Sequence, residues 1–440
     1  MLVTTIAITA VVAMGLIGWR VVKGDSDTSG STPGEWDRIA LVDRTTGGVT
    51  TIDESGDVDA EIVGFGRVVA THTFGSRIAL IGAEQIVIVD VEQPSAEPVL
   101  IPIDRGSTVT PAPTTDSLHL IVGDPSGGNV LIVDVADGSV IDVGASAEQS
   151  SPLMFAETVR WAADGSAFAI ADAANFQTIV VQPALPGATF LPDQPVAVGD
   201  ELVATSQTVG LQADVSLVDL QRRNRAIVPS EIPAGGVMTD DRLVTVSIDG
   251  GVFRVEDGDE MATPLGSLAV PAGNRVHSVR PTFNGERLVI AGDAFEAVIG
   301  LDGDTLFTTS FTAPLDIPTP HPAWSCLAIG GDDTYHSLIS LDTGGQLIDL
   351  TGLVVTGASS DGCTVIGERA GITEVATTDG SVRLGQIRSA ALGPDGRTVV
   401  WTTTTGRTEL LTIDDDLQLT DPIDLSEAAP SNLAVVFVNG

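Results

Sequence analysis

Two histidines, two arginines and two tryptophans are the side chains of this sequence best suited to binding or chemistry. They occupy similar places in a repeated pattern of short strands: His72, Arg160, Trp161, Arg280, His321 and Trp324. If the first strand of each repeat faces a common channel, these six side chains form a candidate ligand-binding set there. The arginines would attract an anionic ligand, the histidines would serve as bases or ligand atoms, and the tryptophans would stack on the ligand. The alternatives are solvated channel histidines and tryptophans that pack in the core.

The sequence contains no motif of a familiar catalytic or metal centre. No two of its five histidines stand at the H-x-H or H-x₃-H spacing that favours a zinc site. It also lacks a G-x-S-x-G elbow, a P-loop and a G-x-G-x-x-G turn. Asp302-Gly303-Asp304 and Asp414–Asp416 resemble fragments of calcium loops, but hairpin aspartates normally cap their own turns. We therefore predict no catalytic residue, no metal ligand and no cofactor.

Cys326 and Cys363 are the only cysteines, and they raise the question of a disulfide. The segments S-C-L-A-I-G and G-C-T-V-I-G align, which places both cysteines at one register of adjacent repeats. Equivalent side chains in successive repeats follow one another rather than face, and packed sheets lie about 10 Å apart, beyond disulfide reach. We therefore expect two free thiols, with a bridge as the alternative, so the cysteines do not settle the compartment.

The chain is strongly acidic. Its 440 residues carry 59 Asp and Glu against 21 Lys and Arg, which gives a net charge of −38, and Lys23 is the only lysine. Such a surface repels phosphate backbones, so we expect no nucleic-acid partner. It suits cations, basic partners or simply solubility in high salt.

A four-strand phrase recurs from about residue 36 to the end of the chain. Its clearest copy is Ser389–Thr420, in which a Pro-Asp-Gly turn precedes the apolar strand Arg397–Thr402. The second strands of the copies begin near residues 77, 117, 166, 201, 242, 286, 326, 363 and 397. A period of about 40 residues with four strands in each copy is typical of a β-propeller.

The segments at the two ends resemble halves of one further copy. Arg38–Asp43 and Val49–Asp53 look like its third and fourth strands, and Asn432–Val438 with the residues before it looks like its first two. A blade shared between the ends leaves few open strand edges. We therefore predict an all-β fold, a single β-propeller of about 8–10 four-stranded blades closed by the N- and C-terminal strands in one blade. Ten is the direct count, and eight applies if the weakest copies merge.

The P-D-G-R turn at Pro394–Arg397 and the phrase V-D-V-A-D-G-S-V at Val133–Val140 resemble the WD40, YVTN and TolB-like propeller superfamily. The resemblance covers roughly residues 36–440 and rests on structural motifs. The W-D pair that closes WD40 repeats is absent from the ends of the third strands. The resemblance implies a propeller fold and a general role in binding, and it carries over no catalytic residue.

The N-terminal segment Leu2–Trp19 is apolar apart from three threonines. As a helix it would rise about 27 Å, enough to cross a hydrocarbon core. No basic region precedes it and no A-x-A site follows suitably, which favours an uncleaved anchor over a signal peptide. The predicted organisation is a transmembrane anchor at 1–23, a flexible linker at 24–35 and the propeller at 36–440. Arg20 and Lys23 after the helix point the body toward the cytoplasm, but two charges decide little, and we favour an extracytoplasmic propeller.

These observations predict a prokaryotic, non-catalytic β-propeller with a monomeric body and a single-pass membrane anchor. We expect it to bind a protein partner and to act as a protein-interaction or cell-envelope scaffold. The reasons are the missing catalytic constellation and the apolar N-terminal stretch. The alternatives are a propeller enzyme of the lactonase, glycosidase or quinone-dependent dehydrogenase type, and a small-ligand or ion sensor that uses the central channel.

Overall fold

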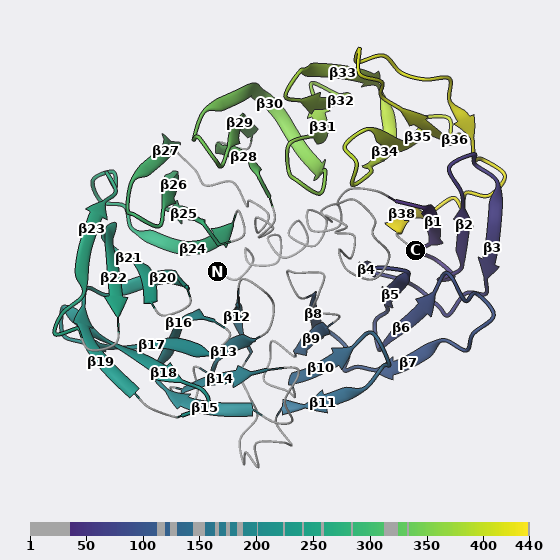
Figure 1. Ribbon diagram of the computed structural model, residues 1–440. Helices are drawn as coiled ribbons and strands as arrows, with labels where there is room; N and C mark the ends of the chain where they lie inside the picture. Colours follow the sequence, from purple (N-terminus) through teal and green to yellow (C-terminus); the bar gives the residue numbers. More distant parts are fainter. Residues whose placement is uncertain are drawn as a thin grey trace, which may run out of the picture. The chain divides into compact units, whose positions relative to one another are not determined.

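The computed structural model describes residues 36–111, 119–123, 130–143, 155–162, 167–172, 177–182, 188–199, 201–222, 225–239, 242–256, 259–282, 285–311, 324–331 and 334–438. Over these residues 38 strands form nine sheets, and every strand pair is antiparallel (Figure 1). None of the described helices is long and apolar enough to cross a membrane. The predicted anchor at 1–23 and linker at 24–35 lie outside the described residues.

Six sheets follow one another along the chain, each a meander of four consecutive strands. They are β4 (Ala70–Phe74), β5 (Arg77–Ile81), β6 (Gln85–Asp90) and β7 (Val99–Pro102); β8 (Thr108–Pro111), β9 (His119–Gly123), β10 (Val130–Asp134) and β11 (Val140–Asp142); β12 (Phe155–Trp161), β13 (Phe168–Asp172), β14 (Gln177–Val181) and β15 (Ala188–Pro192); β16 (Gln194–Val198), β17 (Leu202–Val209), β18 (Gln212–Asp219) and β19 (Arg225–Ser230); β20 (Pro233–Met238), β21 (Arg242–Ser247), β22 (Gly251–Glu256) and β23 (Thr263–Ser267); β24 (Val276–Thr282), β25 (Arg287–Gly292), β26 (Phe295–Gly300) and β27 (Thr305–Ser310).

The other three sheets contain the C-terminal strands and the first strands of the chain. One has six strands, namely β28 (Cys326–Gly331), β29 (Thr334–Ser340), β30 (Gln346–Ala358), β31 (Val365–Arg369), β32 (Ile372–Thr377) and β33 (Gly380–Gly385). The next comprises β34 (Ile387–Leu392), β35 (Thr398–Thr403), β36 (Thr408–Thr412) and β37 (Ile423–Asp424). The last joins β1 (Arg38–Asp43), β2 (Val49–Ile52) and β3 (Val58–Ile62) to β38 (Leu433–Val438).

The repeat phrase correctly locates the second strand of each copy. All nine of these strands begin within two residues of the predicted positions, and β5, β21 and β28 begin at the predicted residues 77, 242 and 326. These strands are apolar and mostly buried because the second strand of a blade is covered on both faces by neighbouring sheets. The β-propeller assignment is therefore confirmed.

The structure has nine sheets, which lies between the two sequence counts of ten and eight. The copies whose second strands are β28 and β31 share the 13-residue strand β30, so they form one six-stranded sheet. The residues before β28 that were expected to form a first strand, including His321, lie outside the described residues. A sequence period cannot reveal that two copies are joined by a continuous strand.

The two ends of the chain share one sheet, as predicted, but not in the expected proportion. β38 pairs with β1 over six residue pairs, from Arg38 opposite Val438 to Asp43 opposite Leu433. The sheet takes three strands from the N-terminal side and one from the C-terminal side, in the order β3-β2-β1-β38. The expected division was two and two, because the polar segment V-D-A-E-I of β3 does not look like a strand in the sequence.

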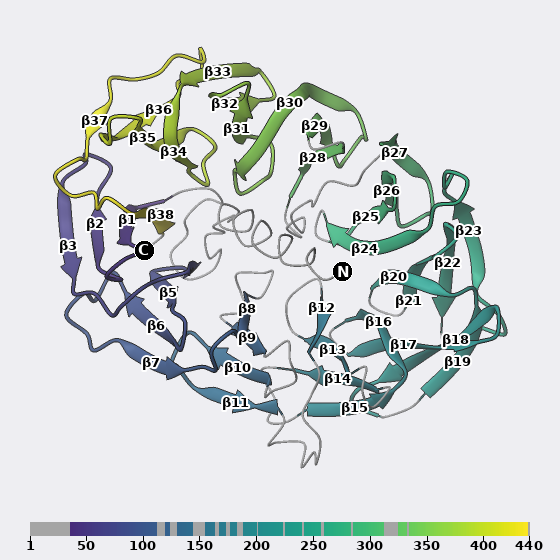
Figure 2. The same cartoon turned by 180° about the vertical axis from the view of Figure 1, so that it is seen from behind.

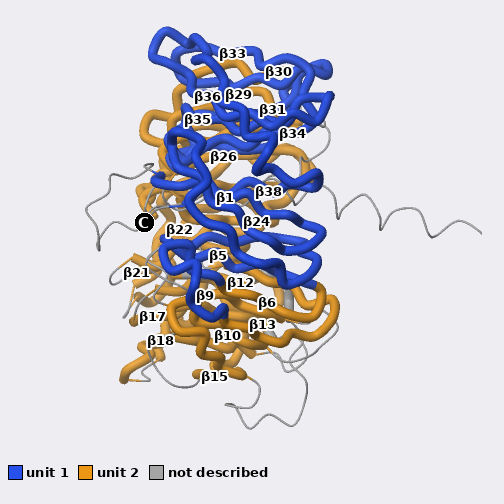
Figure 3. Tube along the Cα trace, turned by 90° about the vertical axis from the view of Figure 1, so that its right-hand side faces the viewer, with its two compact units in different colours: residues 1–82, 89–98, 352–440 blue, residues 83–88, 99–351 orange. Residues whose placement is uncertain are grey.

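The chain divides into two compact units (Figure 3). Unit 1 comprises residues 1–82, 89–98 and 352–440, and unit 2 comprises residues 83–88 and 99–351. Within unit 1, β38 contacts β4 and β31 contacts β34. Within unit 2, β12 contacts β16, β16 contacts β20 and β20 contacts β24, so neighbouring sheets meet through their first strands, which Figure 2 shows from behind.

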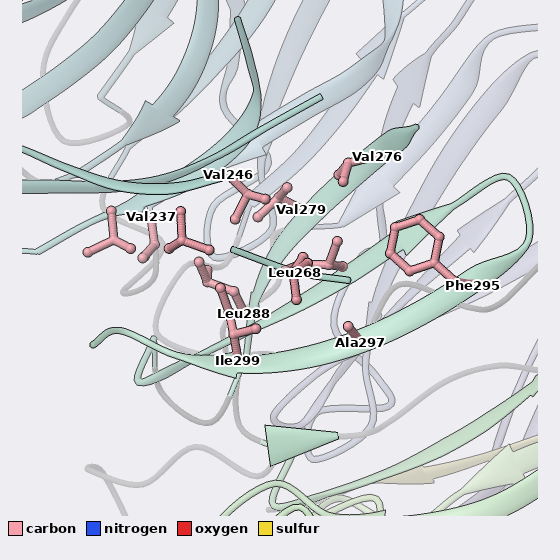
Figure 4. Close-up of a cluster of buried hydrophobic side chains, with 12 residues drawn as sticks. Val237, Val246, Leu268, Val276, Val279, Leu288, Phe295, Ala297 and Ile299 are labelled. Carbon is pink, nitrogen blue, oxygen red and sulfur yellow. The ribbon is translucent and has the colours of Figure 1, made fainter. Parts of the chain in front are cut away.

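The core of unit 2 lies in the seams between successive sheets. One seam packs Val237, Val244 and Val246 of β20 and β21 against Val279 and Leu288 of β24 and β25 (Figure 4). All five side chains are buried. Because apolar burial stabilises by roughly 25 cal/mol per Å², this seam holds β20 and β24 firmly together, and these are the strands that position the site described next.

The prediction that both cysteines are free thiols is wrong. Cys326 and Cys363 are both disulfide-bonded. The predicted alignment assumed that they share one register, but Cys326 is the first residue of β28 whereas Cys363 lies in the turn before β31, which begins at Val365. Since successive residues of a strand point to opposite faces, an error of this kind in the register invalidates the argument that the two thiols cannot meet.

Candidate anion-binding site

Arg160 is the central side chain of the candidate site. It is the penultimate residue of β12 and is partly buried. Its Nη1 donates a hydrogen bond to the carbonyl oxygen of Val279 at 3.2 Å, and its Nη2 donates to the carbonyl oxygen of Ala234 at 3.3 Å. The guanidinium of Arg160, which belongs to the sheet that contains β12, thus donates to backbone carbonyls of two other sheets, at β20 and β24.

The two carbonyl groups are accessible because β20 and β24 are edge strands. Each is the first strand of its sheet and pairs on one side only, with β21 and β25. The other backbone edge presents N–H and C=O groups that need partners. Arg160 supplies partners for two of the carbonyls, with donors that cannot lose their proton in a protein.

Glycine at position 235 of β20 permits this approach. A Cβ atom there would lie 3.3 Å from Arg160 Nη1 and 3.1 Å from the Cβ of Val279. The β20–β21 pairing also shifts register between Pro233 and Gly235, which leaves Ala234 at an irregularity. Such bulges turn backbone groups away from the ladder, and here the Ala234 carbonyl turns to the guanidinium.

Arg280 brings a second positive charge to the same place. It lies on β24, one residue after Val279, and its Nε donates a hydrogen bond to the hydroxyl of Ser278 at 3.1 Å. Burial, and then the neighbouring Arg280 charge, lower the pKa of Arg160. Two guanidinium groups that repel each other are thus neighbours in a chain of net charge −38.

The remaining predicted site residues divide between described and undescribed parts of the chain. His72 lies on β4 in unit 1, where its Nδ1 is buried and has no hydrogen-bond partner among the described residues. Trp161 ends β12 in unit 2, and Trp324 lies two residues before the start of β28 and is only 4% exposed. His321 lies outside the described residues. Among the predicted residues of unit 2 whose side chains the structure describes, Arg160 and Arg280 lie together, and a ligand-binding role for the set remains a prediction.

Sequence reasoning missed Glu296, a buried acid in unit 2. It stands in the wholly buried strand β26, F-E-A-V-I-G, and only 3% of it is exposed. Its carboxyl group accepts a hydrogen bond from the backbone N–H of Gly330 in β28, and its Oε2 has no hydrogen-bond partner among the described residues. Burial raises the pKa of Glu296 to about 8. One acidic residue inside an apolar strand was the available signal.

The predicted calcium-loop fragments behave as turn caps where the structure describes them. The Asp414 carboxylate accepts the N–H groups of Asp416 at 3.0 Å and Gln418 at 2.7 Å, and Asp302 accepts that of Asp304 at 3.1 Å. Over the described ranges, no group of three or more His, Cys, Asp or Glu side chains is placed to hold a metal ion.

Comparison with other proteins gives the fold and no activity. No protein-family profile and no curated protein matches the chain. Similar solved structures include one described as the crystal structure of the eukaryotic initiation factor, with 10% identity, a TM-score of 0.47 and coverage of 92% of this chain and 98% of that chain. The C-terminal WD40 domain of Sif2 shows 10% identity, a TM-score of 0.39 and coverage of 77% and 93%. Dihydro-heme d1 dehydrogenase NirN in complex with DHE shows 13% identity and a TM-score of 0.38, and the match covers 91% of this chain and 75% of that chain.

The predicted resemblance to WD40 and TolB-like propellers is confirmed at the level of the fold by the repeated four-stranded sheets. These similar structures include a WD40 domain and a dehydrogenase. At such identities and TM-scores they say nothing about what this chain binds or whether it catalyses a reaction.

Proposed function

We propose that this chain is a non-catalytic binding β-propeller whose first strands in unit 2 receive an anionic group of a partner. The observation that carries the proposal is the pairing of Arg160 with Arg280 beside the open edges of β20 and β24. Arginine remains protonated at every physiological pH. A site built from two arginines is therefore suited to binding an anion, and unsuited to removing or supplying a proton.

A tether belongs to the same proposal. The apolar segment Leu2–Trp19 would hold the propeller at a membrane while its body meets a protein or cell-envelope partner. Its supporting observations are the length of the segment and the polar residues that follow it. Sodium carbonate washing of membranes that contain the full chain tests this part: we expect the chain to stay in the pellet. Complete release into the wash contradicts an integral anchor.

The competing function is a propeller enzyme of the lactonase, glycosidase or quinone-dependent dehydrogenase type. Such an enzyme would use the arginine pair to stabilise negative charge in a transition state and would need a base or nucleophile within hydrogen-bond reach of the same ligand. The Ser278 hydroxyl lies within hydrogen-bond distance of Arg280, and it accepts a hydrogen bond from Arg280 Nε. This arrangement orients an arginine rather than activating a nucleophile, which favours binding.

Partner capture with charge variants tests the proposed function. The full chain is used as bait against an envelope extract of its source, in parallel with Arg280→Gln and with Arg222→Gln. Arg222 serves as the control because its side chain is 79% exposed and pairs only loosely, at 3.8 Å, with Asp219. We expect Arg280→Gln to lose the captured protein and Arg222→Gln to retain it. Equal capture by all three baits contradicts a role for the arginine pair.

A further inference from the structure

We propose that the outer edge of β27 is a docking site for an extended segment of a partner protein with a basic residue at each end, which adds to this sheet as a further strand. This inference goes beyond the proposed function, because β27 lies at the opposite side of its sheet from β24 and does not involve the arginine pair (Figure 1). It is argued from the composition of β27, from the direction of its backbone groups and from the charges near its ends.

β27 differs in composition from the other outer strands that the structure describes. An open strand edge is a template for pairing with another chain, and proteins commonly protect such edges with charged residues or proline. β27 reads T-L-F-T-T-S and contains neither. The outer strands of the other sheets each contain at least one such residue, namely Asp59 and Glu61 in β3, Pro102 in β7, Asp142 in β11, Pro192 in β15, Arg225 and Pro229 in β19, Pro264 in β23, Arg383 in β33 and Asp424 in β37.

The backbone of β27 directs two exposed residues away from its sheet. Phe311, the residue after β27, donates its N–H to the carbonyl oxygen of Ala294 at 3.0 Å and so faces β26. Hydrogen-bonded and non-hydrogen-bonded pairs alternate along an antiparallel ladder, so Thr309 also faces β26, whereas the N–H and C=O groups of Thr308 and Ser310 point outward. Both of these residues are exposed. Within the described part of the chain β27 pairs with β26 alone, so these backbone groups form an open edge.

The open edge matches the repeat of an extended peptide. Thr308 and Ser310 are two residues apart, which is about 7 Å along a strand, and an extended partner presents its own outward N–H and C=O groups at that same spacing. The edge is closed further back by the turn after β29, because a Cβ atom on Gly344 would lie 2.3 Å from the carbonyl oxygen of Leu306. The site therefore offers two N–H and two C=O groups to a short added strand.

Acidic side chains lie near both ends of this edge. Asp304 directly precedes β27 and is exposed. Asp293 lies near the other end, next to Ala294, and its side chain is 50% exposed. A hydrogen bond with His277 is the main cause that lowers the pKa of Asp293, so this carboxyl group is ionised at neutral pH. A partner segment with a basic residue at each end is therefore attracted here, and one with acidic ends is repelled by a chain of net charge −38.

Fluorescence anisotropy with a labelled peptide of sequence K-T-V-T-V-T-V-K tests the docking site. With the full chain we expect saturable binding. The same peptide with glutamate in place of both lysines should bind at least about tenfold more weakly, and the lysine peptide with N-methyl groups on alternate residues should lose binding, because it lacks the N–H donors of one edge.

Thr308→Pro tests the same hydrogen bonds from the side of the protein. Proline removes an N–H that points outward and leaves the ladder with β26 intact, so we expect peptide affinity to fall by at least about tenfold. Thr308→Ala is the matched control, since it shortens the side chain but keeps the N–H, and it should bind within about threefold of the parent. Circular dichroism shows whether Thr308→Pro folds, and the N-methylated peptide tests the edge on the unaltered chain.

The outcomes separate this inference from the proposed function. Peptide binding that is unchanged in a folded Thr308→Pro variant, or equally tight binding of the N-methylated peptide, overturns the docking site. Equal binding of the lysine and glutamate peptides overturns the basic partner. A dimer of the parent in sedimentation velocity that Thr308→Pro abolishes means that a second copy occupies the edge, and it overturns the partner assignment. Arg280→Gln should bind the peptide like the parent, so the absence of peptide binding overturns this inference alone and leaves capture through Arg280 as a separate question.

Discussion

Arg160 on β12 and Glu296 on β26 are two ionisable side chains of unit 2 that are at least partly buried. They differ in the backbone groups that hydrogen-bond to them. Arg160 meets two carbonyl oxygens on the open edges of β20 and β24. Glu296, in the wholly buried strand β26, accepts a hydrogen bond from the N–H group of Gly330. The guanidinium keeps its charge, whereas burial raises the pKa of the carboxyl group to about 8 and leaves it neutral at pH 7.

The difference follows from where each strand stands in its sheet. An edge strand displays unpaired carbonyls in a row, and a cation placed beside them replaces most of its lost hydration. An interior strand such as β26 has its backbone already paired on both sides, with β25 and β27. An acid on that strand obtains a partner only from the next sheet. Edges therefore favour binding sites with fixed charge, and seams favour groups whose charge depends on pH.

The largest test of this contrast is removal of the disulfide at the start of β28, the strand that supplies Gly330 to Glu296. Replacing Cys326 and Cys363 by serine frees a segment of the chain, and we expect a loss of roughly 3–4 kcal/mol in the free energy of unfolding. Denaturant titration measures it. Hydrogen exchange should accelerate at the Gly330 amide and stay unchanged at Val279. A loss below about 1 kcal/mol would mean that the bridge adds little to a seam that is already rigid.

Arg160→Met tests how much the hydrogen bonds of Arg160 contribute to stability. The substitution keeps the length of the apolar stem but leaves the carbonyl oxygens of Ala234 and Val279 without their donor. A buried acceptor that is left without a donor costs about 1–3 kcal/mol. Because Arg160→Met leaves two carbonyl oxygens without their charged donor, we expect the free energy of unfolding to fall by roughly 3 kcal/mol. The exposed control Arg222→Met should stay within about 0.5 kcal/mol. Equal thermal unfolding of the two variants would show that solvent readily replaces Arg160.

Glu296 makes the stability of the folded chain depend on pH. Its folded pKa of about 8 lies above the ordinary value of 4.5, so the folded state favours the protonated form. The stabilisation from this preference is complete below pH 4.5 and is lost as the pH rises through 8. Between pH 6 and pH 9 we expect a loss of roughly 2 kcal/mol.

Glu296→Gln isolates this contribution because glutamine keeps the shape and does not titrate. Its free energy of unfolding, measured by urea titration at several pH values, should lose the component that declines between pH 6 and pH 9. Glu231→Gln, on the loop after β19, is a matched substitution at an exposed glutamate. Parallel pH profiles for the parent and Glu296→Gln would show that another group governs the alkaline decline.

The sequence predicts where the strands begin better than it predicts their register and which residues lie beside them. An Asn-Gly turn before β25 and an Asp-Gly turn before β35, each followed by an apolar run, locate these strands to within a residue, because local turn chemistry and burial on both faces leave a clear pattern. The register of Cys363 was misjudged because alignment of two short segments cannot show that one begins in a turn. β3 was missed since an outer strand exposes most of its side chains and carries little apolar signal.

The site shows the same limit. The repeat pattern assigned Arg160 and Arg280 to first strands, but these residues are separated by 120 positions, and a period does not show which carbonyl each guanidinium meets. The face on which Glu296 lies was likewise unpredictable. Residues 295, 297 and 299 of β26 fill the seam toward β20 and β21, so alternation turns Glu296 to the opposite face and to Gly330. That assignment requires the order of the sheets, which only the structure supplies.

Ser278→Ala is the substitution with the smallest expected effect on stability and binding. It tests whether the Ser278 hydroxyl orients the guanidinium of Arg280. Its hydroxyl accepts the Nε–H of Arg280 at 3.1 Å, and both residues lie on β24, so the bond orients the side chain without joining two sheets. We expect the free energy of unfolding to fall by less than about 1 kcal/mol. The affinity for the captured partner should fall roughly two- to threefold, because Arg280 then samples more rotamers before it binds. Ser278→Thr, which keeps the hydroxyl, should restore the affinity. If Ser278→Ala captures the partner as well as the parent does, the hydroxyl has no orienting role, and Arg280 contributes charge alone.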